Sequence, residues 1–134
     1  MTFLSKYRKN QDGAAVIEFA LAMPIVIMLF FGMAQFGLIL LANSGIRHAL
    51  DKAARTATVY VGATLITDQQ IRNTVTANLY GIQSGTVSNP VVSRGVVDGV
   101  TYVDISVTYS TSIDFILYTY SPISLTETRR AYLP

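Results

Sequence analysis

The pattern of hydrophobic and polar residues divides the chain into a long apolar first part and a shorter alternating second part. No ionisable side chain occurs from Phe19 to Ile46. About 20 apolar residues are enough for a helix to cross a bilayer. The run therefore predicts a transmembrane helix near the N-terminus, with its membrane segment at about residues 19–42.

Beyond this run the apolar positions keep a helical period. They recur at steps of three and four residues, as in an amphipathic helix, and are Ile46, Leu50, Ala53, Ala57 and Tyr60 or Val61. Arg47, Asp51 and Arg55 are spaced for ion pairs between residues four apart. The sequence Asn43-Ser44-Gly45 could break the helix, since an interior glycine costs about 1 kcal/mol relative to alanine. Because the apolar phase continues across it, we predict one helix at residues 14–61, about 70 Å long.

A short second helix is predicted at the start of the remaining region. Thr67 is a helix-capping residue by type and position, and apolar residues follow it at four-residue spacing, namely Ile71, Val75 and Leu79. Gly81 is placed where it could stop this helix.

Alternating apolar and polar residues then predict strands, at residues 86–93, 100–109, 113–120 and 123–132. Turn residues at 94–95 and 98–99 join the first two strands in a hairpin. Ser121-Pro122 is expected to end the third strand. The last is predicted as an edge strand whose outward residues include Thr126, Thr128 and Arg130. With one helix laid across this antiparallel sheet, residues 62–134 form a small domain outside the membrane, and the fold class is α+β.

Composition narrows the classes of protein further. Hydrophobic residues make up 51% of the chain and charged residues 13%, a balance far from that of a typical soluble domain. The chain contains no cysteine, so disulfides and thiolate metal sites are excluded. The net charge is +2 with no basic stripe, so nucleic-acid binding has no support.

Candidate catalytic and ligand-binding residues are sparse. The single histidine, His48, has no cysteine or second histidine with which to bind zinc, and we interpret it as a solvated helix residue. Asp98, Asp104 and Asp114 lack the spacing of a calcium loop. We interpret four tyrosines as strand packing, namely Tyr102, Tyr109, Tyr118 and Tyr120. We therefore predict no enzyme activity, no catalytic or metal-binding residue, no cofactor and no small-molecule substrate.

One carboxylate, Glu18, stands at the head of the apolar run. An acid at the middle of a bilayer costs on the order of 2–3 kcal/mol, so a carboxylate retained in such a segment indicates a function. The alternative is an interfacial acid in the first turn of the helix, where the macrodipole favours an anion by a few tenths of a kcal/mol. The acid by itself leaves both interpretations open.

The order of elements around Glu18 favours a functional role. A basic segment containing Lys6, Arg8 and Lys9 is followed by Gly13 and only then by the apolar run. A secretory signal instead has its cleavage site after the apolar segment. A cut after Gly13 would leave the whole helix on the mature protein, which would begin Ala14-Ala-Val-Ile-Glu18-Phe19.

This arrangement resembles the type IV prepilins. The short leader, residues 1–13, and the form Gly-x-x-x-x-Glu-Phe resemble the Tad (tight adherence) branch, and in particular the TadE-like minor pilins and pseudopilins. The residues that carry the resemblance are the stretch from Gly13 to Pro24, the groups Phe31-Gly32 and Gln35-Phe36-Gly37, and Ala53-Ala54-Arg55-Thr56-Ala57. The match is specific from Gly13 to Ala57 and weak afterwards.

The resemblance implies processing by a prepilin peptidase between Gly13 and Ala14, and a role in assembly for Glu18 and Phe19. It also implies other pilins and Tad assembly-platform proteins as partners, in addition to the lipid bilayer. The function it implies is that of a minor pilin or pseudopilin acting in pilus assembly or initiation and in surface adherence.

Flanking charge predicts the orientation. Basic residues are retained on the cytoplasmic side, and Lys6, Arg8 and Lys9 precede the helix. We expect a single-pass protein of the bacterial inner membrane, with its N-terminus inside and its C-terminal domain outside, or in or at the tip of a pilus. The alternative is an uncleaved single-pass membrane protein whose outer domain binds an envelope partner.

Overall fold

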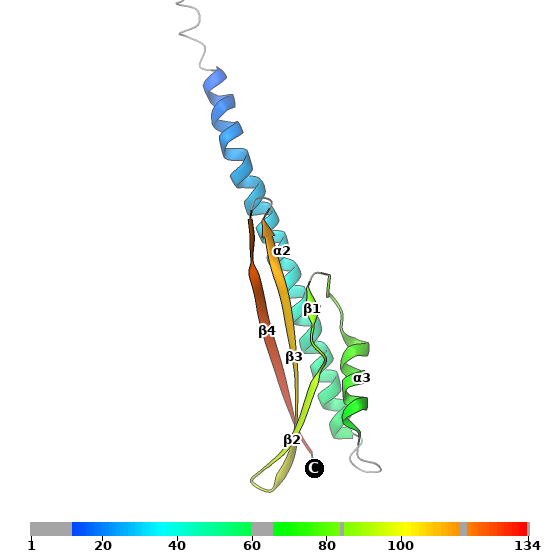
Figure 1. Ribbon diagram of the computed structural model, residues 1–134. Coiled ribbons are helices and arrows are strands. Elements are labelled where there is room, and N and C mark those ends of the chain that lie inside the picture. Colours follow the sequence, from blue (N-terminus) through cyan, green and yellow to red (C-terminus); the bar gives the residue numbers. More distant parts are fainter. Residues whose placement is uncertain (1–11, 60–65, 84, 116–117, 134) are drawn as a thin grey trace, which may run out of the picture.

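The computed structural model describes residues 12–59, 66–83, 85–115 and 118–133. Along the chain a long helix is followed by a short helix and by a sheet (Figure 1). The predicted α+β fold is confirmed. The predicted leader lies outside the described residues except for its last two positions, and so do Tyr60 and Val61 at the expected end of the long helix.

The long helix, α2, is Asp12–Val59 and has 48 residues, which corresponds to about 70 Å at 1.5 Å per residue. It continues without interruption through Pro24 and Gly45, so the predicted continuity is confirmed. Its N-terminal half stands clear of the rest of the molecule, and its C-terminal half lies between the sheet and the short helix (Figure 1).

Close packing explains why α2 contains Gly45. The segment after the short helix crosses α2 so closely that a Cβ atom on Gly45 would collide with the carbonyl oxygen of Tyr80 and lie 2.9 Å from its carbonyl carbon. The residue after Tyr80, Gly81, has a φ of +74°, and a Cβ there would lie 3.0 Å from the carbonyl oxygen of Leu41, one turn before Gly45 on α2. The two glycines thus let two backbones meet.

The short helix, α3, is Asp68–Asn78. The Gln70 amide donates to the Thr67 hydroxyl (3.3 Å) and the Thr67 amide donates to the Gln70 side chain (3.0 Å), so both partners of a capping box are present. Ile71 and Val75 are fully buried. The expectation that Gly81 stops this helix is wrong: α3 ends at Asn78, and Gly81 is needed for its close approach to α2.

The sheet has four antiparallel strands, β1 (Thr86–Val87), β2 (Val91–Val97), β3 (Val100–Phe115) and β4 (Tyr118–Tyr132). Strand β3 is central. It pairs with β4 along one edge, so β1 and β2 share its other edge. Asp98 (φ +53°) and Gly99 (φ +81°) form the two-residue turn between β2 and β3, as a type I′ hairpin requires, so the turn predicted there is confirmed. The turn predicted at residues 94–95 is wrong, because both residues pair with β3 within β2.

Two strand predictions are wrong. Residues 86–93 are not one strand, because β1 and β2 are separated by residues 88–90. There Pro90 has no amide hydrogen for the ladder, and the Ser88 hydroxyl accepts a hydrogen bond from the Thr108 amide (3.0 Å). Residues 113–120 are not one strand either. Strand β3 continues to Phe115, which pairs with Tyr118 at the start of β4.

Ser121-Pro122 does not end a strand, because β4 continues through it. Thr111 pairs with Ile123 and Ile113 pairs with Tyr120, so the register shifts here and β4 has one extra residue. A proline is tolerated at such a bulge on an edge strand. The predicted edge position is confirmed, since β4 pairs with β3 alone among the described strands.

The core lies between the inner face of β3 and the C-terminal half of α2. Alternate β3 residues are buried, as expected for a sheet with one covered face, and are Val103, Ile105, Val107 and Tyr109. They form one cluster with the predicted helical stripe Ile46, Leu50, Ala53 and Ala57. On the uncovered face Thr126, Thr128 and Arg130 lie opposite Thr108, Ser106 and Asp104, so their predicted outward direction is confirmed.

Candidate functional site

The four residues predicted to act in processing and assembly lie in the first turns of α2. Gly13, Ala14, Glu18 and Phe19 are all exposed. A Cβ atom on Gly13 would meet nothing within 4 Å. Because Ala14 and Glu18 are four residues apart, they share one face of the helix, at a separation of about 6 Å along its axis.

The surroundings of Glu18 are apolar and open. Val16, Ile17, Phe19 and Leu21 are each more than 60% exposed, and within the described part of the chain the Glu18 carboxylate has neither a hydrogen bond nor an ion pair. The sheet lies far along α2 from this end (Figure 1). Within residues 12–133 as described, no side chain neutralises Glu18.

The apolar surface of α2 indicates where a bilayer can lie. Of the described helices, this one is long and apolar enough to cross a membrane. Its large apolar side chains are exposed as far as Leu40 and Leu41. Ile39 and Ala42 are buried, and Ala42 belongs to the core cluster. The last residues of the predicted segment 19–42 thus also serve in packing the C-terminal part of the protein.

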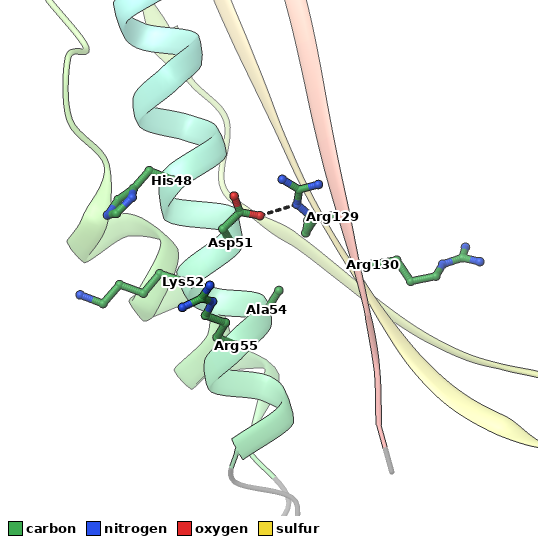
Figure 2. Close-up of a pocket in the computed structure, with 7 residues that line it drawn as sticks. All are labelled: His48, Asp51, Lys52, Ala54, Arg55, Arg129 and Arg130. Carbon is green, nitrogen blue, oxygen red and sulfur yellow. Dashed lines mark ion pairs between the residues drawn. The ribbon is translucent and has the colours of Figure 1, made fainter.

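Two ion pairs join the C-terminal half of α2 to β4. Arg47 contacts Glu127 at 2.9 Å, and Asp51 contacts Arg129 at 2.5 Å (Figure 2). The expected pairs along the helix surface, between Arg47 and Asp51 and between Asp51 and Arg55, are therefore replaced by pairs to the strand. Glu127 and Arg129 point toward α2 because they lie opposite the buried residues Val107 and Ile105.

A cleft of about 840 Å³ lies beside these pairs, between α2 and β4. Its lining residues are His48, Asp51, Lys52, Ala54, Arg55, Arg129 and Arg130. In Figure 2 Arg55 lies in front of α2, Lys52 extends from α2 on the side away from β4, and Arg130 points away from the helix. Asp51 is the one acid in the lining, so the cleft carries a positive charge.

Arg130 has its partners on the uncovered face of the sheet. It donates two hydrogen bonds of 2.7 Å to the carboxylate of Asp104, and its guanidinium lies 4.0 Å from the ring centre of Tyr102. The hydrogen bonds from Arg130 lower the pKa of Asp104. Hydrogen bonding to Asp104 in turn raises the pKa of Arg130.

Sequence reasoning located the head of α2 but missed the cleft. The charged residues at positions 48–55 were visible as the polar face of a helix. Their relation to Arg129 depends on β4 lying against α2, and no local pattern shows that. The outward and inward alternation along β4 was the available signal, because it predicts that Arg129 faces opposite to Arg130.

Comparison with known proteins gives one match. The family model described as TadE-like protein matches residues 13–55. Searches of curated proteins and of solved structures found no match. The matched segment contains Gly13, Ala14, Glu18 and Phe19, and it ends within the cleft at Arg55. This chain is therefore similar to TadE-like proteins over residues 13–55, about a third of its length.

Proposed function

We propose that this protein is a minor pilin or pseudopilin of a Tad-type pilus. In this proposal a prepilin peptidase cleaves between Gly13 and Ala14, and the mature subunit acts in pilus assembly or initiation and so in surface adherence. Its partners are other pilins and the Tad assembly platform. The N-terminus lies in the cytoplasm before cleavage, and the sheet and α3 lie outside the inner membrane.

The observation that carries the proposal is the carboxylate of Glu18, which has no partner among the described residues and lies on an exposed apolar helix, one turn from Ala14. A carboxylate placed there without a partner is costly in a bilayer. The cost is offset if cleavage creates a cation nearby. The new α-amino group of Ala14 would supply one, since its reference pKa is near 8.

Pairing between subunits would give this charge pair a role in assembly. Two unit charges 4 Å apart attract by about 4 kcal/mol at an effective dielectric constant of 20. A Glu18 that meets the Ala14 amine of a neighbouring copy would thus favour one register of helix packing. The exposed ring of Phe19 would pack beside the pair. The interfacial interpretation of Glu18 supplies only a few tenths of a kcal/mol and no preference for a register.

The deciding experiment replaces Glu18 by glutamine in a host with a complete Tad system. We expect normal membrane insertion and normal cleavage, with incorporation into pilus fractions reduced at least tenfold, which a loss of about 1.4 kcal/mol would produce. Glu18→Asp is the matched control, because it keeps the charge, and should retain part of the incorporation.

A second control separates a local effect from a general loss of charge. Glu127→Gln removes an acid of β4 that pairs with Arg47, far along α2 from Glu18, and should assemble normally. If Glu18→Gln assembles and supports adherence as well as the parent, the role between subunits is wrong. If the mature protein also keeps Met1, the alternative of an uncleaved membrane protein with an envelope partner is favoured.

A further inference from the structure

Ion pairing consumes eight of the described charges of the C-terminal region and leaves Asp98, Lys52, Arg55 and, on α3, Arg72 without an ionic partner. Four acids pair with four arginines, namely Asp51 with Arg129, Asp68 with Arg94, Asp104 with Arg130, and Glu127 with Arg47. Of the acids after residue 50 whose side chains the structure describes, Asp98 is left without an ionic partner. Within the same described part, the side chains of Lys52 and Arg55 also have none, and both line the cleft.

Asp98 occupies the turn of the β2–β3 hairpin. This turn lies at the end of the molecule opposite to the head of α2 (Figure 1). Its flanking valines are unusually exposed: Val96 by 65%, Val97 by 43% and Val100 by 43%. The turn, residues 96–100, therefore combines an apolar surface with one carboxylate. We call it the hairpin tip.

The tip cannot fill the cleft of its own chain in the observed fold. Arg130 at the cleft pairs directly with Asp104 on β3, whereas Asp98 lies six residues farther toward the end of that hairpin. Four of these steps lie in β3 and the turn adds about one more, so at about 3.3 Å per step the tip lies roughly 15 Å beyond Arg130 along the strand direction. A second copy displaced by that distance along the long axis would have its cleft level with the hairpin tip of the first copy.

We propose that the hairpin tip of one copy docks in the α2–β4 cleft of a second copy. Asp98 would meet Lys52 and Arg55, and the valines would pack on Ala54 and on the aliphatic stems of the two cations, which can bury their methylene groups. The contact joins two different surfaces. Such a head-to-tail contact does not close on itself unless the rotation closes a ring, and otherwise generates a filament.

This inference rests on the proposed function, because the contact requires two copies displaced along the long axis. Two copies that span one flat bilayer are instead level with each other. Their helices share the same hydrocarbon layer of about 30 Å, so tip and cleft stay roughly 15 Å apart along the long axis. Stacking along a filament axis supplies the displacement. The contact is therefore expected in assembled pilus material and not between subunits waiting in the membrane.

Disulfide cross-linking tests the contact cleanly, since the chain contains no cysteine. One tagged copy carries Val97→Cys, which leaves the Asp98-Gly99 turn intact, and a second carries His48→Cys in the cleft. In pilus fractions we expect a mixed dimer at least tenfold above the control pair of Val97→Cys with Gln69→Cys, an exposed position on α3. A chain with both Val97→Cys and His48→Cys should give a ladder of multimers.

Charge removal provides the second arm. Asp98→Asn keeps a residue that tolerates the turn's positive φ and should lower the Val97–His48 cross-link at least tenfold. Lys52→Glu with Arg55→Glu should do the same, and adding Asp98→Lys to that variant should restore part of it. The proposal would be overturned if cross-links form only between two Val97→Cys copies and not between Val97→Cys and His48→Cys. It would also be overturned if Asp98→Asn leaves the Val97–His48 cross-link unchanged.

The two proposals fail in different ways. If Glu18→Gln loses incorporation but the tip and cleft variants neither cross-link nor alter assembly, the docking contact is wrong and the proposed function stands. If Glu18→Gln assembles normally while the tip and cleft cross-link in pilus fractions, the role of Glu18 is wrong and the docking contact stands.

Discussion

Gly45 shows how a single missing side chain positions a whole segment. A helical glycine is unfavourable by about 1 kcal/mol relative to alanine, so its presence in a continuous helix needs a compensating contact. That contact is the Tyr80 backbone, which lies where a Cβ atom would be. The edge-to-face contact between His48 and Tyr80, 5.7 Å between ring centres, lies beside it. The connection from α3 to β1 is thereby held against α2.

Gly45→Ala should therefore destabilise the protein although alanine favours the helix. The collision with Tyr80 should cost about 1–3 kcal/mol, which exceeds the helical gain of about 1 kcal/mol at the upper end. Gly37→Ala is the matched control, because a Cβ there meets nothing within 4 Å. Thermal unfolding of both variants in detergent micelles, followed by circular dichroism, measures the difference. A Gly45→Ala protein at least as stable as Gly37→Ala would contradict this explanation.

Gly13 is a second residue whose lack of a side chain has a predicted consequence. The space around it is open, so Gly13→Leu should leave the fold of the chain unchanged. A peptidase that must approach the Gly13 backbone would be crowded by leucine, and we expect cleavage to fall at least tenfold, equivalent to about 1.4 kcal/mol in the transition state. N-terminal sequencing of the membrane protein reports the cleaved fraction, with Gly37→Leu as a control. Normal cleavage of Gly13→Leu would refute the predicted site.

At the scale of elements, the β3–β4 pair is the scaffold that places charges on both faces of the sheet. One residue of alternation separates Arg129, which faces α2 and pairs with Asp51, from Arg130, which faces outward and pairs with Asp104. A shift of one residue in the register would exchange these faces. The two ion pairs therefore help to specify the register of β4 on β3 and, with it, the face of β4 that packs on α2.

The Asp104–Arg130 pair should make stability depend on pH in acid. Because hydrogen bonds from Arg130 lower the pKa of Asp104 in the folded state, the folded protein binds fewer protons there than the unfolded chain. The pair's contribution is thus present above the unfolded pKa, near 4, and is lost as the pH falls through the folded pKa. Asp104→Asn should lower the melting temperature at pH 7 and have a smaller effect at pH 2.

The comparison needs a control for general acid effects. Asp98→Asn removes an acid that has no ionic partner among the described residues and should change the difference between pH 7 and pH 2 less than Asp104→Asn does. An Asp104→Asn protein whose melting temperature differs equally from the parent at both pH values would rule out this linkage.

At the scale of the whole molecule, one helix serves two environments. Its first half exposes large apolar residues, and its second half is buried in the core of the α+β region. Few residues separate the two halves, since Leu41 is the last large apolar residue exposed before the core cluster begins at Ala42, and beyond it only Val59 at the end of α2 is exposed among the large apolar residues of this helix. The C-terminal region must therefore sit directly on the membrane surface if α2 spans the bilayer.

This arrangement gives a topology prediction. With the N-terminus inside, protease added to spheroplasts should remove the region from about residue 64 to residue 134 and leave the apolar half of α2 protected. A reporter that works only outside the cytoplasm should be active when fused after Tyr132. Activity of a cytoplasm-only reporter at the same position would reverse the assignment.

The sequence by itself determined the features whose signals are local. The apolar run and its unbroken phase gave the length and continuity of α2, Thr67 and Gln70 gave the cap of α3, and Asp98-Gly99 gave the β2–β3 turn. The place of Gly13, Ala14, Glu18 and Phe19 at the head of α2 follows from the same apolar run, whereas their roles in processing and assembly are what the resemblance to TadE-like proteins implies. Each of these depends on residues close in the chain, so periodicity and turn chemistry suffice.

Only the tertiary structure decided which surfaces meet. Residues 113–120 looked like one strand because their alternation continues, yet β3 and β4 pair through that segment. Helical spacing predicts that Asp51 pairs with its neighbours on α2, but β4 places Arg129 against it instead. The cleft depends on this approach of β4 to α2. The physical reason is that side chains distant in sequence choose partners by the approach of whole elements, which local propensity does not encode.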